Sequence, residues 1–200
     1  KEFYQKFNFE VEFTGHPLLD AIQQRERSEE ELNKLRRELN IGSKPVVLLL
    51  PGSRMQEIST MLPVMLEVVE QFTDYEFVIG AAPSIKEEVY AQLLGGKNIR
   101  VVRNRTYDLL SISHAALVTS GTATLETALF NVPEVVCYKG GKISYYIARS
   151  LVKIKFISLV NLIMDREVVK ELIQDEMNVD AVSSELKKLL EKDPRGKMLN

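Results

Sequence analysis

The chain has 200 residues, of which 45% are hydrophobic, so it can bury one sizeable core. A formal net charge of −2 excludes nucleic-acid binding that relies on an overall positive charge. The single cysteine excludes an intrachain disulfide framework and is typical of a reducing cytoplasm. The apolar runs are too short to span a bilayer, and we expect no secretory signal.

Aromatic residues crowd the start of the chain, ahead of the first expected helix. They are Phe3, Tyr4, Phe7, Phe9 and Phe13. Because so many aromatic side chains precede any core element, we expect the chain to be a fragment of something larger. His16 stands before Pro17 at an apparent domain junction, and we interpret its ring as a partner in an interdomain hydrogen bond.

The first clear strand is residues 46–50, an uninterrupted run of valine and leucine. Such a run is typical of a strand buried on both faces of a parallel sheet. Residues 51–54, here called the Arg54 loop, follow it. Gly52 permits a tight turn, Ser53 could cap the next helix, and Arg54 adds a fixed fork of donors.

Glu57 lies three residues beyond Arg54, where it could pair with the arginine or complete a capping box with Ser53. Ligands of open α/β sheets bind at the carboxyl ends of the strands, so the Arg54 loop is a candidate binding loop. The alternative is a surface arginine beside an ordinary turn.

Strand and helix patterns then alternate along the chain. We expect strands at 76–80, 99–102, 115–119 and 135–138, and helices at 57–72, 84–94, 107–113, 122–130, 165–174 and 179–191. Regular alternation favours the α/β class with a doubly wound parallel sheet.

Residues 120–126, here called the Gly121 motif, follow the strand at 115–119. A glycine turn that opens a helix leaves backbone N–H groups and a positive helix end directed at one spot, which suits a phosphate. Glu126 lies one helical turn beyond Thr122, where a carboxylate can accept hydrogen bonds from sugar hydroxyls. We therefore predict a nucleotide held by its diphosphate and ribose. A purely structural helix start capped by Ser120 or Thr122 explains the motif about equally well.

The remaining site candidates are weaker. We place a base near residues 104–106, although a solvated turn with Arg103 and Arg105 on the surface fits as well. His114 is interpreted as a packing or capping residue and Cys137 as part of the core.

No cluster with metal-ligand spacing is visible, so we expect neither a metal nor a cofactor. The charge of a departing diphosphate must then be met by backbone N–H groups, a helix end and cations. Arg54, the turn at Gly121 and Thr122, and Lys139 are the candidates.

Residues 139–164 contain five basic residues and no acidic residue, interleaved with aromatic and aliphatic ones; the basic residues are Lys139, Lys142, Arg149, Lys153 and Lys155. This composition suits contact with anionic headgroups and acyl chains. An ordinary amphipathic helix that packs on the sheet is the alternative.

Five motifs together resemble the C-terminal half of bacterial lipid-A-disaccharide synthases, in family order and over residues 9–190. They are GHPLLD (15–20), LLPGSR with Glu57 (49–57), SGTATLE (120–126), SLVNL (158–162) and EVVKELIQ (167–174). The resemblance implies a two-domain glycosyltransferase of the GT-B architecture, whose Rossmann-like C-terminal domain holds the nucleotide. It also implies an interdomain segment at 1–16, the UDP-sugar-binding domain at 17–192 and a tail at 193–200.

The resemblance further implies the reaction of the family. UDP-2,3-diacylglucosamine is joined to 2,3-diacylglucosamine 1-phosphate, which forms the β-1,6-linked disaccharide of lipid A and releases UDP. The N-terminal domain would supply most of the acceptor site and the general base, so we expect this chain alone to bind without catalysing. The implied location is cytoplasmic, on the inner face of a Gram-negative inner membrane, with contact to anionic lipid. A homodimer is a further expected partner, and nucleic acid is not.

Matched position by position, Arg54 corresponds to the family arginine near the diphosphate and Glu126 to the acid that takes the ribose hydroxyls. The full set of expected UDP-binding residues is Gly52, Ser53, Arg54, Asn104, Ser120, Gly121, Thr122, Ala123, Glu126 and Lys139. The chain departs from the family at Val160, often a proline, and at Lys139, often an arginine. A lysine is a point charge, which weakens the case for bidentate phosphate contact there.

Two other functions stay open at this point. A UDP-N-acetylglucosamine 2-epimerase shares the fold, but its active-site acids and histidines are not evident. A stand-alone nucleotide-binding module without chemistry is the second. A dinucleotide-binding dehydrogenase is disfavoured, because no G-x-G-x-x-G follows the first clear strand.

Overall fold

The structure is a computed structural model that describes residues 2–12, 15, 18, 20, 22, 27–140 and 155–191. His16, most of the basic stretch at 139–164 and the expected tail at 193–200 lie outside the described residues.

The described residues form a six-stranded sheet in the order β3-β2-β1-β4-β5-β6, and every neighbouring pair is parallel. The strands are β1 (Val46–Leu50), β2 (Glu76–Ala81), β3 (Arg100–Arg103), β4 (Ser113–Thr119), β5 (Glu134–Tyr138) and β6 (Lys170–Ile173). The chain therefore builds outward from β1 on one side, returns, and builds outward on the other side from β4. The predicted doubly wound α/β architecture is confirmed.

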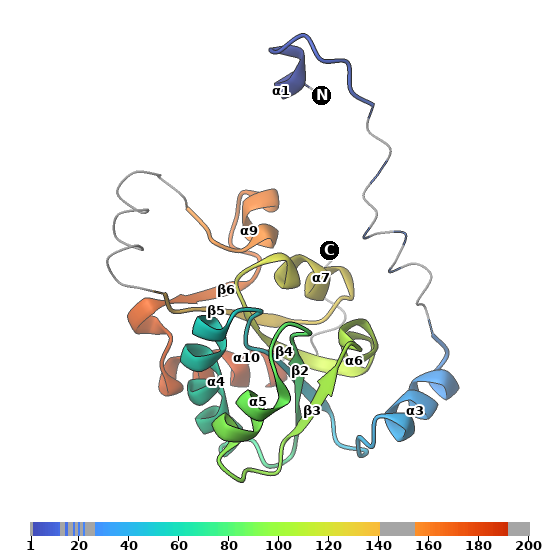
Figure 1. Ribbon diagram of the computed structural model, residues 1–200, viewed down its shortest axis with the longest axis vertical. Helices are drawn as coiled ribbons and strands as arrows, with labels where there is room; N and C mark the ends of the chain where they lie inside the picture. The colour runs from blue at the N-terminus through green and yellow to red at the C-terminus, as the bar shows by residue number, and fades with distance from the viewer. Residues whose placement is uncertain are drawn as a thin grey trace.

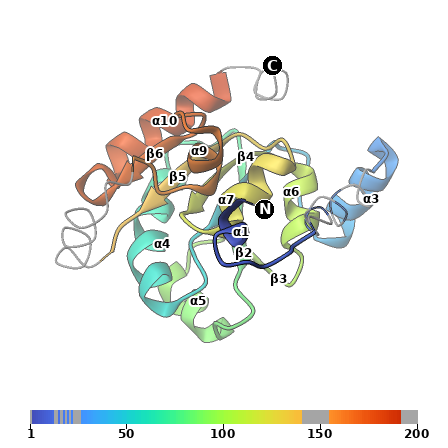
Figure 2. The same cartoon turned by 90° about the horizontal axis from the view of Figure 1, so that it is seen from above.

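Helices cover both faces of the sheet (Figures 1 and 2). They are α3 (Glu29–Glu38), α4 (Met55–Val69), α5 (Glu87–Leu94), α6 (Thr106–Ile112), α7 (Thr122–Leu129), α9 (Leu159–Met164) and α10 (Val179–Glu191), with a short 3₁₀ turn η1 (Gln174–Glu176). The short helix α1 (Glu2–Gln5) lies apart from the sheet (Figure 1). One apolar cluster joins the sheet to α4, α5 and α10, and a second joins the other face to α3 and α6. A small third cluster joins α7 and α9 to β5.

The central strand β1 shows why the sheet forms. All five of its residues are buried, with Val47 and Leu49 in one cluster and Leu48 and Leu50 in the other. Both faces of the strand are thus apolar, as its sequence predicts. Cys137 on β5 is fully buried as expected, and burial raises the pKa of its thiol to about 12.

Most predicted elements are present with ends shifted by a few residues, but the helix predicted at 165–174 is wrong. Residues 170–173 form β6, which pairs with β5, and a helix lies earlier, at 159–164. Spacing of Val168, Val169 and Leu172 imitates a helical face. Residues 170–173 instead pair with β5 as a parallel strand. Glu171 and Leu172 are therefore buried on opposite faces of the sheet.

The described helices include none that is long and apolar enough to cross a membrane.

One acid of the sheet is buried without a hydrogen-bond partner among the described residues. Glu134, at the start of β5, is 1% exposed, and neither of its carboxyl oxygens has a hydrogen-bond partner among the described residues. Burial therefore raises the pKa of the Glu134 carboxyl well above its ordinary value.

A pH-dependent stability follows for Glu134. Because its folded-state pKa is raised, the folded protein binds more protons than the unfolded chain above the ordinary pKa, so stability falls as pH rises through the folded-state pKa. Glu134→Gln should remove this loss. We expect the melting temperature of the wild type to fall relative to that of E134Q as the pH rises above the ordinary pKa of a glutamate carboxyl. Glu88→Gln, at an exposed acid of α5, is the control, and parallel curves for wild type and E134Q would contradict the assignment.

Candidate functional site

The Arg54 loop and the Gly121 motif border one cavity. The strand order reverses at β1, so the carboxyl ends of β1 and β4 are neighbours, and each carries one of the two segments. Together they line a cavity of about 460 Å³, a size typical of small-molecule sites. The predicted residues that line it are Gly52, Ser53, Arg54, Ser120, Gly121, Thr122, Ala123 and Glu126.

The Arg54 loop is held by Glu57, which also lines the cavity. One carboxylate oxygen of Glu57 accepts from the backbone N–H groups of Ser53 (2.9 Å) and Arg54 (3.2 Å), and the other from the Arg54 guanidinium (3.1 Å). Gly52 has φ of +112°, and a Cβ there would lie 2.6 Å from Glu57 Oε2, so this turn requires glycine. The expected cap at Ser53 is wrong, because the helix α4 begins after Arg54 and Glu57 takes the loop's N–H groups.

Because Glu57 accepts from the backbone N–H groups of Ser53 and Arg54, the donor that this loop leaves for a ligand is the Arg54 side chain. Arg54 has 82% of its side chain exposed, and its ion pair with Glu57 is of the surface kind that contributes little stability. The guanidinium is therefore available to an anion in the cavity.

The Gly121 motif is arranged in the opposite way. No side chain caps α7 among the described residues, so the alternative with Ser120 or Thr122 as a structural cap is wrong. Ser120 Oγ instead donates to the carbonyl of Ile157 (2.8 Å), and Thr124 Oγ1 to the carbonyl of Gly121 (2.9 Å). The first N–H groups of this eight-residue helix thus lack a side-chain acceptor at the cavity wall.

Gly121 itself is extended, with φ of 162°, so its backbone does not demand glycine. A Cβ there would meet no atom within 4 Å. The absent side chain leaves open space beside the start of α7, through which a ligand could approach the backbone closely.

Glu126 is half-buried in the cavity wall. Its carboxylate accepts a hydrogen bond from the Tyr107 hydroxyl (3.4 Å). Burial raises the pKa of the Glu126 carboxyl, and this hydrogen bond acts against the rise. Tyr107 is a neighbour that sequence reasoning missed, since nothing in its spacing connects α6 with α7.

A third segment also lines the cavity and was missed. Gly80 and Ala81 at the end of β2, together with Ala82 and Pro83 after it, complete the wall beside the Arg54 loop. Ser84 Oγ donates to the carbonyl of Ser53 (3.0 Å), which ties the two segments together. The run of small residues after a buried strand was a signal that could have identified this segment.

Arg103 and Tyr90 fix that third segment. Arg103 Nη2 donates to the carbonyls of Pro83 (3.2 Å) and Ile85 (2.7 Å), and the buried Tyr90 hydroxyl accepts from Ala82 N–H (2.9 Å). The reading of Arg103 as a solvated surface residue is therefore wrong.

Two predicted site residues are not in the cavity lining. Asn104 is exposed at a φ of 55°, one step before Arg105, while Thr106 does line the cavity. Arg105 forms ion pairs with Asp108 and, at 3.6 Å, with Glu38, so it anchors this turn to α3 rather than standing free at the surface. Lys139, directly after β5, is half-buried and also outside the lining.

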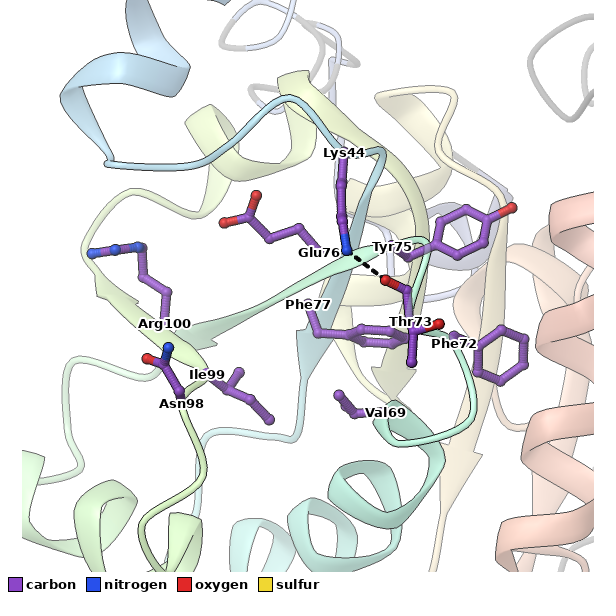
Figure 3. A pocket seen from close by; sticks show the side chains of 10 residues that line it. All are labelled: Lys44, Val69, Phe72, Thr73, Tyr75, Glu76, Phe77, Asn98, Ile99 and Arg100. Atoms are coloured by element: carbon purple, nitrogen blue, oxygen red, sulfur yellow. Dashed lines mark hydrogen bonds between the residues drawn. The ribbon is translucent and has the colours of Figure 1, made fainter.

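A different cavity, of about 420 Å³, lies at the amino ends of β1, β2 and β3 (Figure 3). Its charged side chains tie neighbouring turns together. Lys44 Nζ donates to the carbonyl of Thr73 (2.6 Å), and Glu76 accepts from the Gly42 N–H (2.7 Å). None of the residues that line this cavity starts a helix, so it lacks the amide groups that the Gly121 motif brings to its cavity. His114 lies at the amino end of β4, with its ring 6.3 Å from that of Tyr75, as expected for a packing residue.

Among the described residues, no group of three or more His, Cys, Asp or Glu side chains could hold a metal ion. What the cavity offers is a helix start with uncapped amides, one exposed guanidinium, the Glu57 carboxylate that holds the Arg54 loop, and the half-buried Glu126 carboxylate. This combination suits a ligand that carries both an anionic group and hydroxyls.

Comparisons with known proteins match this chain to one family. The family model described as "Lipid-A-disaccharide synthetase" matches residues 1–199. A lipid-A-disaccharide synthase of Geobacter sulfurreducens is 35% identical over an alignment 195 residues long, which covers 94% of this chain and 50% of that protein. One of Persephonella marina is 36% identical over an alignment 197 residues long, which covers 92% of this chain and 51% of that protein. The chain thus spans about half the length of the curated relatives it matches.

Solved structures show a similar fold at low identity. The ADP-heptose LPS heptosyltransferase II of E. coli has a TM-score of 0.60 at 15% identity, over 82% of this chain and 52% of that one. An Anabaena protein, HepE, in complex with UDP and glucose has a TM-score of 0.59 at 15% identity, over 90% and 48%. A putative UDP-N-acetylglucosamine 2-epimerase of Listeria monocytogenes has a TM-score of 0.56 at 19% identity, over 90% and 45%. Transferases and epimerases share this fold, so the fold alone does not choose between them.

Proposed function

This chain belongs to the lipid-A-disaccharide synthetase family, and we propose that it is the part of such an enzyme that binds the UDP-sugar donor. The observation that carries the proposal is the single cavity bordered by the Arg54 loop and the Gly121 motif. The family matches favour this reading over the 2-epimerase and over a binding module without chemistry.

The reaction we propose for the whole enzyme is a glycosyl transfer between two lipids. The 6-hydroxyl oxygen of 2,3-diacylglucosamine 1-phosphate attacks C1 of the glucosamine in UDP-2,3-diacylglucosamine. The bond from C1 to the diphosphate oxygen breaks, and UDP leaves with its electron pair. We assign the base that takes the hydroxyl proton to the part of the relatives that this chain does not span.

In this reaction, the chain would stabilise the leaving diphosphate. Negative charge grows on the phosphate oxygens as the C1–O bond breaks, and preorganised donors stabilise such charge most strongly where water is excluded. The amides at the start of α7 and the guanidinium of Arg54 lie on two walls of the same cavity and would meet this charge together. Lys139 is not in the cavity lining, so it would contact the diphosphate only if its side chain moved toward the cavity when the ligand binds.

We further propose that Glu126 accepts hydrogen bonds from the ribose hydroxyls. Its half-buried carboxylate lies one helical turn beyond the amides that would hold the diphosphate, and Tyr107 orients it. A preference for UDP over 2′-deoxy-UDP that disappears in Glu126→Ala is the corresponding measurement. The uracil would lie toward Thr106, the lining residue next to Asn104 and Arg105.

Arg54→Ala tests the nucleotide site. Loss of a charge-assisted hydrogen bond should weaken UDP binding by about 1–3 kcal/mol in calorimetry. Arg100→Ala is the matched control, because it removes the same charge from an exposed arginine at the opposite edge of the sheet (Figure 3). We expect R100A to bind UDP as the wild type does. Equal affinities for R54A and the wild type would remove Arg54 from the site.

We also propose peripheral contact with an anionic membrane on its cytoplasmic face. Three neighbouring apolar residues of α9 are exposed, namely Leu162, Ile163 and Met164, at 45%, 64% and 50%. Lys155 and Arg166 are exposed on either side of the helix in the sequence, and Lys155 pairs with the exposed Asp165 at 3.2 Å. Apolar side chains flanked by basic ones are typical of surfaces that lie on anionic lipid.

Ile163→Glu should reduce co-sedimentation with anionic liposomes, because it places a charge at the most exposed apolar position of α9. Gln92→Glu, at an exposed position of α5, adds the same charge elsewhere and should leave co-sedimentation unchanged. Co-sedimentation of I163E equal to that of the wild type, or binding that ignores the anionic lipid, would argue against this contact.

A further inference from the structure

The buried carboxylate of Glu171 on β6 organises the segment that precedes α9. Its Oε2 accepts from the backbone N–H of Ile157 (2.9 Å). Its Oε1 accepts three hydrogen bonds, from Ser158 N–H (3.0 Å), Ser158 Oγ (2.7 Å) and Asn161 Nδ2 (2.8 Å). A side chain that is only 9% exposed thus has both oxygens satisfied by one short stretch of chain.

Asn161 fastens the same stretch to β6 from the other side. Its Oδ1 accepts from the N–H groups of Val168 (2.7 Å) and Val169 (3.0 Å), and its Nδ2 also donates to the Val169 carbonyl (2.8 Å). With Glu171, it forms a closed set of polar contacts that fixes residues 157–161 against β6. Such a fully satisfied buried network is rigid, because every member that moves breaks several hydrogen bonds.

This network reaches the cavity through one residue. Ile157 donates its N–H to Glu171 and accepts, at its carbonyl, the hydrogen bond from Ser120 Oγ (2.8 Å). Ser120 lines the cavity and is followed by Gly121 and the uncapped start of α7. The two hydrogen bonds of the Ile157 peptide units therefore connect Glu171 to the wall of the cavity.

We propose that Glu171 is a positioning residue for the nucleotide diphosphate. Through Ile157 and Ser120 it holds the Gly121 motif at the place where the first amides of α7 meet the phosphates. The inference rests on the proposed function, since it assigns to Glu171 a role in binding UDP. Glu171 itself is on β6, which β5 separates from β4, and it is not among the residues that line the cavity.

Glu171→Gln should break the hydrogen bond from Ile157 and keep those from Ser158 and Asn161. An amide has one oxygen acceptor, and its NH₂ group only donates. Directed at Ser158 and Asn161, the NH₂ would face three donors; directed at Ile157, it would face one. The second orientation is favoured, so E171Q should keep Ser158 and Asn161 in place and release Ile157.

A double-mutant cycle on the 200-residue chain tests the proposal with UDP as the probe, followed by calorimetry. Glu171→Gln and Ser120→Ala should each weaken UDP binding by about tenfold, the loss expected for one hydrogen bond in a rigid site. The double variant should be no weaker than either single variant, because both substitutions cut the same connection. Glu134→Gln, the same substitution at a buried acid of the adjacent strand, is the matched control and should bind UDP unchanged.

Three results would overturn the proposal. E171Q that binds UDP as tightly as the wild type removes Glu171 from the site, and losses that multiply in the double variant show that Glu171 does not act through Ser120. If the wild type itself does not bind UDP, both the role of Glu171 and the proposed function are overturned. If the wild type binds UDP and E171Q binds it equally well, only the role of Glu171 is overturned. If E171Q melts below the assay temperature, Glu171→Asp retains the charge, and the same coupling with Ser120→Ala is required of it.

Discussion

The site depends on one constraint, the reversal of strand order at β1 in an all-parallel sheet. Because β1 lies between β2 and β4, the chain leaves the carboxyl ends of β1 and β4 in opposite directions, and the cavity lies at the crevice between them. Residues about 70 apart in sequence therefore share one cavity. The apolar faces of β1 hold this arrangement, since both helical layers pack against that strand.

The two segments in the crevice contribute different chemistry. In the Arg54 loop, Glu57 takes the amides and leaves the guanidinium exposed. In the Gly121 motif, the side chains turn away to Ile157 and Gly121 and leave the amides of α7 uncapped. A diphosphate in the cavity would thus meet the exposed Arg54 guanidinium on one wall and the backbone amides of α7 on the other. The Glu171 network has a place in this arrangement, because fixed dipoles act only if their loop is held still.

Sequence reasoning predicted most of the sheet and the pairing of the two segments, because buried parallel strands and glycine turns carry local signals. It failed where contacts between distant residues decide. The run at 165–174 has helical spacing, yet the open edge of β5 makes part of it a strand. Ser120 has the composition of a cap, yet its hydroxyl finds a carbonyl of residue 157. Likewise, Tyr107 meets Glu126 only because α6 and α7 start at the same edge of the sheet.

A backbone-amide NMR titration with UDP tests the central claim most directly. The amide signals of Gly121 and Ala123 should shift and saturate together, with Gly52 following, while those of Gly95 and Gly96 after α5 should stay in place. Shifts that instead cluster around Asn98 and Ile99, at the amino edge of the sheet, or a silent Gly121, would contradict the account.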